Sequence, residues 1–228
     1  MLLSIWNMPE KMENLEGSVE EPKYDALLVL GAVMEWDNKK GGWEFPTIIQ
    51  SYAGKLVMGK ARALATREMQ GAATVILVTG GSDKNPRTGE IESRSIELSR
   101  LMTEHYKVPK EKVVPMGKIG ASHTQGNVEN LIAYLEEHPE VLRTRHIGIL
   151  SPRFQKERAE LMFQDNPYFR EHDIDLDWIV VEDVLARRGP LYKKWADKLY
   201  ATPEAEINRQ MEKQGIEDFK SKKYQVKS

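Results

Sequence analysis

Glycines and a carboxylate follow two of the apolar runs in this sequence. Gly31 ends the first run, Gly80 and Gly81 end the second, and Glu92 comes a little later in the chain. Paired glycines allow backbone N–H groups to approach a polar or anionic ligand closely, and the start of a helix adds the positive end of its dipole. Because tight strand-to-helix turns need glycine for their own dihedral angles, these glycines taken alone favour a turn over a ligand site.

A dense polar stretch, residues 120–130, follows the third apolar run and opens a predicted helix. Thr124 or Asn127 is suited to cap this helix, and Glu129 lies in the first turn, where a carboxylate is favourable. Capping explains one or two of these side chains and leaves the others, Asn130 among them, without a role. Such a cluster at the end of a strand could bind a ribose, an amide or a metal-bound water.

Ser151 ends the fourth apolar run, and Gln155 follows it with two arginines nearby. Arg153 and Arg158 could clamp a phosphate or a carboxylate through bidentate hydrogen bonds. The more common explanation of such a run is a solvated helix start with charge pairs between residues four apart.

The apolar runs that carry these groups are short and continuous, as strands buried on both faces are. Amphipathic stretches with helical spacing alternate with them, which predicts βαβ units, right-handed crossovers and a mostly parallel sheet. We therefore expect an α/β fold, a three-layer Rossmann-like sandwich of about five strands, with ligands at the carboxyl ends of the strands near the topological switch point. The predicted strands are residues 25–31, 74–81, 113–116, 146–151 and 176–181, and the predicted helices are residues 51–70, 92–106, 128–137 and 155–163.

The charge of the chain is unevenly distributed. The 228 residues have a formal net charge of -2, but residues 187–228 contain eleven Lys and Arg against six Asp and Glu, a net charge of +5. The rest of the chain therefore has a net charge of -7. We expect an N-terminal arm at 1–23, a Rossmann-like domain at 24–185 and a basic helical C-terminal extension at 186–228.

Composition excludes several classes of protein. A near-neutral total charge argues against a general nucleic-acid binder, and the absence of Cys excludes disulfides, thiolate metal sites and cysteine nucleophiles. The longest apolar runs fall far short of the ~20 residues that a bilayer helix needs, and the N-terminus lacks the features of a signal peptide. We expect a cytoplasmic protein with a small-molecule ligand and no nucleic-acid or membrane partner; a homo-oligomer is compatible with the sequence.

Four strand-end patterns together resemble one known family. The patterns are a strand ending in Leu-Gly, a strand ending in Thr-Gly-Gly with Glu92 downstream, a helix start Thr124-x-x-Asn127-x-Glu129-Asn130, and the segment Ser151-x-x-Phe154-Gln155-x-x-Arg158-Ala159. Over residues 24–182 this order resembles the YdcF/SanA/ElyC-like family, long labelled a domain of unknown function. The positions that match its usual signature are Gly80, Gly81, Glu92, Glu129, Asn130, Arg158 and Ala159.

The sequence departs from that signature at several positions. Gln155 stands where the family usually has His, and a Gln can hydrogen-bond but cannot take up a proton near neutral pH. If that His does acid–base work in relatives, this chain lacks it or uses another residue, and His123 is the nearest substitute in sequence. The remaining departures are Thr124 for Ser, Gly126-Asn127 for Asn-Thr, and Ser151-Pro152 for Thr-Ser.

The resemblance implies a Rossmann-like fold and a strand-end pocket for a nucleotide-like ligand, with S-adenosylmethionine proposed in some members. It implies no reaction, so whether the protein is an enzyme stays open, and no metal is expected. The ligand-binding residues expected on this basis are Gly31, Gly80, Gly81, Glu92, Thr124, Asn127, Glu129, Asn130, Ser151, Gln155 and Arg158.

Two alternative functions belong to other classes. A metal-assisted phosphoester hydrolase would hold Mg²⁺ or Mn²⁺ through Glu35, Glu92, Glu129 and His123. A non-enzymatic protein would use the basic extension to bind a partner, although a helix that packs back on the body with its lysines solvated is the more common arrangement.

Overall fold

The computed structural model describes residues 21–32, 35–39, 41–44, 57–117 and 124–221 of the chain. Most of the expected N-terminal arm, the first part of the expected helix at 51–70, and His123 lie outside the described residues.

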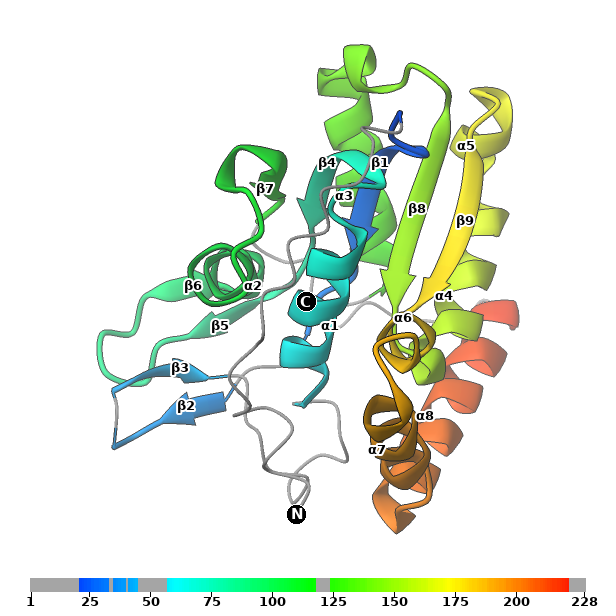
Figure 1. The fold of residues 1–228 in the computed structure, drawn as a ribbon. Helices are drawn as coiled ribbons and strands as arrows, with labels where there is room; N and C mark the ends of the chain where they lie inside the picture. The colour runs from blue at the N-terminus through cyan, green and yellow to red at the C-terminus, as the bar shows by residue number, and fades with distance from the viewer. Residues whose placement is uncertain (1–20, 33–34, 40, 45–56, 118–123, 222–228) are drawn as a thin grey trace.

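A five-stranded parallel sheet forms the centre of the molecule, in the order β7-β4-β1-β8-β9 (Figure 1). The first strand is central, the next two strands of the sheet lie on one side of it, and the last two lie on the other. In this register Leu28 is paired with Leu77 on one side and with Ile149 on the other. The predicted parallel sheet is confirmed, and its strands are β1 (Tyr24–Val29), β4 (Ala73–Val78), β7 (Val113–Pro115), β8 (His146–Ser151) and β9 (Asp175–Val180).

Helices cover both faces of this sheet, which completes the expected three-layer sandwich. Side chains of β1 alternate between two buried clusters, with Leu27 and Val29 in one and Ala26 and Leu28 in the other. This explains why the strand is a continuous apolar run. The first cluster takes side chains from α1 (Val57–Met69), α2 (Arg94–Arg100), α6 (Val181–Ala186) and α7 (Pro190–Tyr200), and the second from α3 (Thr124–Glu137), α4 (Arg153–Asp165), α5 (Pro167–Glu171) and α8 (Pro203–Lys220).

Two short antiparallel ribbons stand beside the sheet and were not predicted. One pairs β2 (Glu35–Asp37) with β3 (Gly42–Glu44), and the other pairs β5 (Ser82–Lys84) with β6 (Ile91–Ser93). Strands of three residues do not show a clear alternation of apolar and polar positions, so the sequence gives no signal for them. Two 3₁₀ turns, Lys110–Lys112 and Pro139–Val141, complete the described elements.

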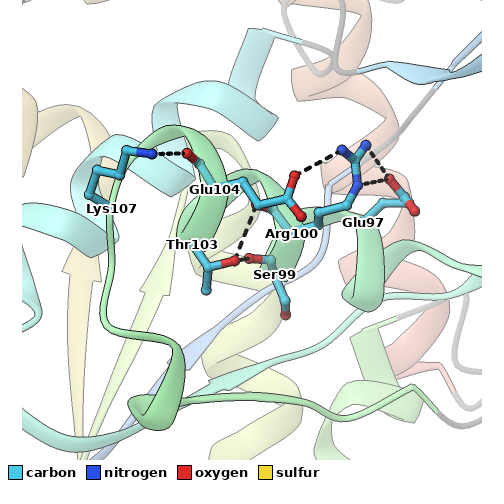
Figure 2. Close-up of polar contacts among 6 residues, drawn as sticks. All are labelled: Glu97, Ser99, Arg100, Thr103, Glu104 and Lys107. Carbon is cyan, nitrogen blue, oxygen red and sulfur yellow. Dashed lines mark hydrogen bonds and ion pairs between the residues drawn. The ribbon is translucent and has the colours of Figure 1, made fainter.

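The helix expected at 92–106 is wrong at its start, because Glu92 lies in β6 and α2 begins only at Arg94. A π-helical segment, Leu101–His105, continues α2. Figure 2 shows that the guanidinium of the exposed Arg100 side chain donates to the carboxylates of Glu97 and Glu104. On the same segment, the Thr103 hydroxyl donates to the carbonyl of Ser99, an interaction that competes with the regular backbone ladder (Figure 2).

Two other helices begin earlier than predicted, α3 at Thr124 and α4 at Arg153. Their first turns are polar, so the apolar spacing on which the prediction rested starts only after them. None of the helices in the described ranges combines the length and the apolar character that a bilayer crossing requires.

The described part of the C-terminal extension is helical, and it packs on the body. Trp195 and Leu199 of α7 belong to the first buried cluster, and Phe219 of α8 packs against the second. The lysines of α7 are exposed. The extension therefore contributes to the core while the lysines of α7 stay in solvent.

Candidate functional site

The topological switch point of this sheet lies between β1 and β8. The chain leaves β1 toward α1 on one face and leaves β8 toward α4 on the other face. In open α/β sheets, ligands bind outside the carboxyl ends of the strands at such a point. The site is therefore built from the ends of these two strands and from the helices that start at this edge, namely α1 and α4, which follow the two strands, and α3, which packs in the same cluster as Leu28 and Ile149.

The glycines at the strand ends allow segments of the chain to approach each other. A Cβ atom at Gly31 would lie 2.6 Å from the Cα of Gly80, and one at Gly80 would lie 3.0 Å from the Cβ of Arg94. The Gly31 N–H donates to Thr79 Oγ1 at 3.1 Å, and the Gly81 carbonyl accepts from the N–H of Arg94 at 2.9 Å. These contacts account for glycine at positions 31 and 80 without a ligand, and ligand contact by Gly81 stays a prediction.

Two of the carboxylates predicted to bind a ligand form hydrogen bonds with residues that are near them in the sequence. Glu92 accepts from Asn85 Nδ2 at 2.7 Å within the loop of the β5–β6 ribbon, and Glu129 lies on the exposed side of α3 and accepts from Gln125 Nε2 at 3.2 Å. In the described ranges no three His, Asp or Glu side chains are grouped so that they could hold a metal ion. The phosphoester hydrolase stays a prediction, because His123 of its suggested metal site lies outside the described residues.

Four buried polar atoms at the carboxyl edge have no hydrogen-bond partner among the described residues: Thr124 Oγ1, Asn127 Oδ1, Asn130 Nδ2 and Ser151 Oγ. Thr124 and Ser151 are each 1% exposed, and Asn127 is 5% exposed. The three α3 residues recur every third position, and the alternation along β8 places Ser151 on the face that bears Ile147 and Ile149, which is the face that α3 covers. The structure thus brings these four predicted residues to one side of the sheet.

Neither Thr124 nor Asn127 is the N-cap that the sequence suggested. Thr124 is already the first helical residue of α3, and Asn127 lies inside its first turn. Their polar groups are therefore not used by capping, which leaves them available to a ligand or to ordered water.

Gln155 is bound to an arginine that sequence reasoning did not single out. Arg62, in α1, donates through Nη2 to Gln155 Oε1 at 3.1 Å, so the two helices of the switch point are linked by this bond. Arg62 is only 2% exposed, and burial lowers its pKa to about 10, which leaves it cationic at neutral pH. The sequence did contain a signal, because Arg62 comes four residues after the buried Met58 and so lies on the buried side of the helix.

The first turn of α4 is capped from the C-terminal part of the chain. The Arg153 N–H donates to Glu182 Oε2 at 3.0 Å, and the Phe154 N–H donates to the Tyr200 hydroxyl oxygen at 3.2 Å. Tyr200 in turn donates to Glu182 Oε1. Glu182 is 1% exposed, and burial raises its pKa despite these bonds. Glu182 lies two residues after the end of β9, so its place behind the fifth predicted strand was a signal in the sequence.

Each arginine of the suggested clamp pairs with a carboxylate of the chain, so ligand binding by Arg153 and Arg158 stays a prediction. Arg153 pairs with Asp183 at 2.8 Å, and Arg158 pairs with Glu212 of α8, Nε to Oε2, at 2.7 Å. The charges that the sequence assigned to a phosphate or carboxylate ligand are thus balanced inside the chain.

Comparisons of the chain with protein-family models, with curated proteins and with solved structures find no match. The resemblance to the YdcF/SanA/ElyC-like family therefore rests on the strand-end residues alone.

Proposed function

We propose that this protein binds a nucleotide-like small molecule at the carboxyl ends of β1 and β8. The observation that carries the proposal is the set of four buried polar atoms on Thr124, Asn127, Asn130 and Ser151 that lack a partner among the described residues. A buried polar group without a hydrogen bond costs about 1–3 kcal/mol, so four of them in one region favour a ligand that supplies the missing partners. Ordered water is the competing explanation.

The chemistry of these groups suits an adenosine moiety. Ribose hydroxyls both donate and accept, as Thr124 and Ser151 do, and a side-chain amide matches the donor and acceptor atoms on the edge of a purine. S-adenosylmethionine, which the family resemblance implies, contains such a moiety, and Asn127, Asn130 and Ser151 would hold it. When bound, it would supply an activated methyl group. We assign no reaction, because Gln155 cannot exchange a proton near neutral pH.

A thermal-shift panel tests the proposal. The melting temperature is measured with adenosine, AMP, ATP, S-adenosylmethionine and S-adenosylhomocysteine, because a ligand of the native state raises stability by RT ln(1 + [L]/Kd). At least one of these compounds is expected to raise it. No shift with any of them at millimolar concentration would contradict the proposal.

Two serine variants separate the ligand site from general effects of burial. Ser151→Ala removes a buried unpartnered hydroxyl at the proposed site. Ser99→Ala removes a comparable hydroxyl on α2. The carbonyl oxygen of Ser99 is the acceptor for Thr103 drawn in Figure 2. We expect the ligand-induced shift to fall in Ser151→Ala and to persist in Ser99→Ala. Equal shifts in the two variants would assign Ser151 to water instead.

A further inference from the structure

The guanidinium of Arg62 is a buried cation with most of its donors unused. Among the described residues, its Nε and Nη1 have no hydrogen-bond partner, and its Nη2 reaches only the neutral amide of Gln155. Buried charges in proteins are normally paired and hydrogen-bonded, because an unpaired charge in a low-dielectric interior is strongly unfavourable. This arginine departs from that rule.

The carboxylate that acts on this charge is engaged elsewhere. Glu182 attracts Arg62 electrostatically, but Glu182 Oε2 accepts from the Arg153 N–H and Glu182 Oε1 accepts from the Tyr200 hydroxyl. Glu182 therefore lowers the electrostatic penalty of Arg62 without satisfying its N–H groups.

The position of Arg62 coincides with the place where the fold binds ligands. Its bond to Gln155 joins α1, which follows β1, to the first turn of α4, which follows β8. These are the two helices that diverge at the switch point. An unsatisfied cation at this point is complementary to a negative group on a ligand bound there.

We propose that Arg62 binds an oxyanion of the ligand, either a phosphate or a carboxylate, through Nε and Nη1. The inference rests on the proposed function, and it narrows the ligand class to anionic nucleotide-like molecules. A guanidinium suits this task because its donors are fixed in a plane that matches phosphate and carboxylate oxygens. Gln155 stands where the family that the sequence resembles usually has His. It orients the guanidinium by accepting a hydrogen bond from Nη2.

Paired ligands that differ in one anionic group test the inference on the wild-type protein. Affinities are measured for AMP against adenosine, and for S-adenosylmethionine against decarboxylated S-adenosylmethionine, which lacks only the carboxylate. A charge-assisted hydrogen bond in a buried site corresponds to an affinity gain of about tenfold or more. We expect that advantage in the first pair if the oxyanion is a phosphate, and in the second pair if it is a carboxylate. Equal affinities within both pairs would overturn the role of Arg62.

Two variants, each of which replaces one arginine of α1, show which side chain gives the anionic ligand its higher affinity. Arg62→Met removes the guanidinium but keeps an apolar stem, and Arg67→Met removes the same charge at a less buried position of α1. The advantage of the anionic ligand is expected to disappear in Arg62→Met and to persist in Arg67→Met. Its persistence in Arg62→Met would contradict the inference. If Arg62→Met does not fold, the wild-type ligand pairs still decide the question.

Inorganic phosphate separates this inference from the proposed function. Phosphate, compared with chloride at equal ionic strength, is expected to raise the melting temperature of the wild type and of Arg67→Met but not of Arg62→Met. If phosphate does so while no adenosine compound binds, the anion site stands and the nucleotide-like ligand is wrong. If adenosine compounds bind without any anion preference, the proposed function stands and the role of Arg62 is wrong. If nothing binds, both are wrong.

Discussion

Arg158 of α4 and Glu212 of α8 form an ion pair, with Nε 2.7 Å from Oε2 and the side chains 19% and 10% exposed. Gly215, one turn further along α8, leaves room for the arginine, because a Cβ atom there would lie 3.0 Å from Arg158 Cδ. The pair and the small residue beside it fix α8 against the body. An arginine that the sequence assigned to ligand binding thus anchors the C-terminal extension.

Breaking this pair is expected to destabilise the fold. Glu212→Gln leaves the charge of Arg158 in a largely buried position, and we expect the free energy of unfolding to fall by about 2 kcal/mol. Urea denaturation measures it. The control is Glu206→Gln on the same helix. The side chains of Arg209 and Glu206 in that pair are 39% and 52% exposed, so solvent screens the pair and its loss should cost much less than that of Glu212.

A double-mutant cycle shows whether the two side chains act as a pair. If they do, Glu212→Gln costs less when Arg158 is already Met than when it is Arg. Strictly additive effects would mean that α8 is held by its apolar contacts alone and that the ion pair contributes nothing measurable.

Local patterns in the sequence predicted the sheet correctly, whereas contacts between distant residues escaped prediction. The runs at 25–31 and 146–151 are continuous and apolar because both faces of β1 and β8 are covered, and that pattern can be read from neighbouring residues. Arg158 and Glu212 are 54 positions apart, and no local spacing links them. The cap of α4 by Glu182 and Tyr200 is of the same kind.

The candidate site could be predicted only in part for the same reason. Strand-end reasoning identified Thr124, Asn127 and Ser151, because topology alone brings the ends of parallel strands to one edge. It did not reveal that the space beside Gly31 is filled by Gly80, since this depends on how closely two strand ends approach. It also missed Arg62, which reaches the switch point from the second turn of a helix.

The close approach of the chain at the ends of β1 and β4 leads to a second prediction, about the stability of the fold. Gly31→Ala would place a Cβ atom 2.6 Å from the Cα of Gly80 and 2.9 Å from the carbonyl oxygen of Thr79, both backbone atoms that cannot move independently. We expect a loss of about 1–3 kcal/mol, measured by urea denaturation. Gly71→Ala is the matched control, because nothing lies within 4 Å of its Cβ position. A loss no greater than that of the control would show that the strand ends separate easily.

Removing the Tyr200 hydroxyl should loosen the start of α4. Tyr200→Phe leaves the Phe154 N–H without its acceptor and deprives the buried Glu182 of one donor. Because partners of buried polar groups are lost, we expect a destabilisation of about 1–3 kcal/mol. Tyr192→Phe on the same helix serves as the control. Hydrogen exchange of the Phe154 amide is expected to speed up in the Tyr200 variant, and unchanged exchange there would contradict the capping role.

Glu182 should give the protein a characteristic dependence of stability on pH. Burial raises the pKa of Glu182 above its ordinary value of 4.5, so the folded state favours the protonated carboxyl. Its contribution to stability is therefore fully present below pH 4.5 and is lost as the pH rises through the folded pKa. Since Gln cannot ionise, Glu182→Gln is expected to become more stable relative to the wild type as the pH rises from about 4 to about 7.

Urea denaturation across this pH range tests the sign, with Glu206→Gln as the opposite case. Arg209 lowers the pKa of Glu206, so its contribution is present above pH 4.5 and is lost as the pH falls through the folded pKa. Glu206→Gln should therefore become less stable relative to the wild type as the pH rises. Parallel pH profiles of the wild type and Glu182→Gln would mean that the bonds from Arg153 and Tyr200 offset the burial of Glu182 completely, and the raised pKa would be wrong.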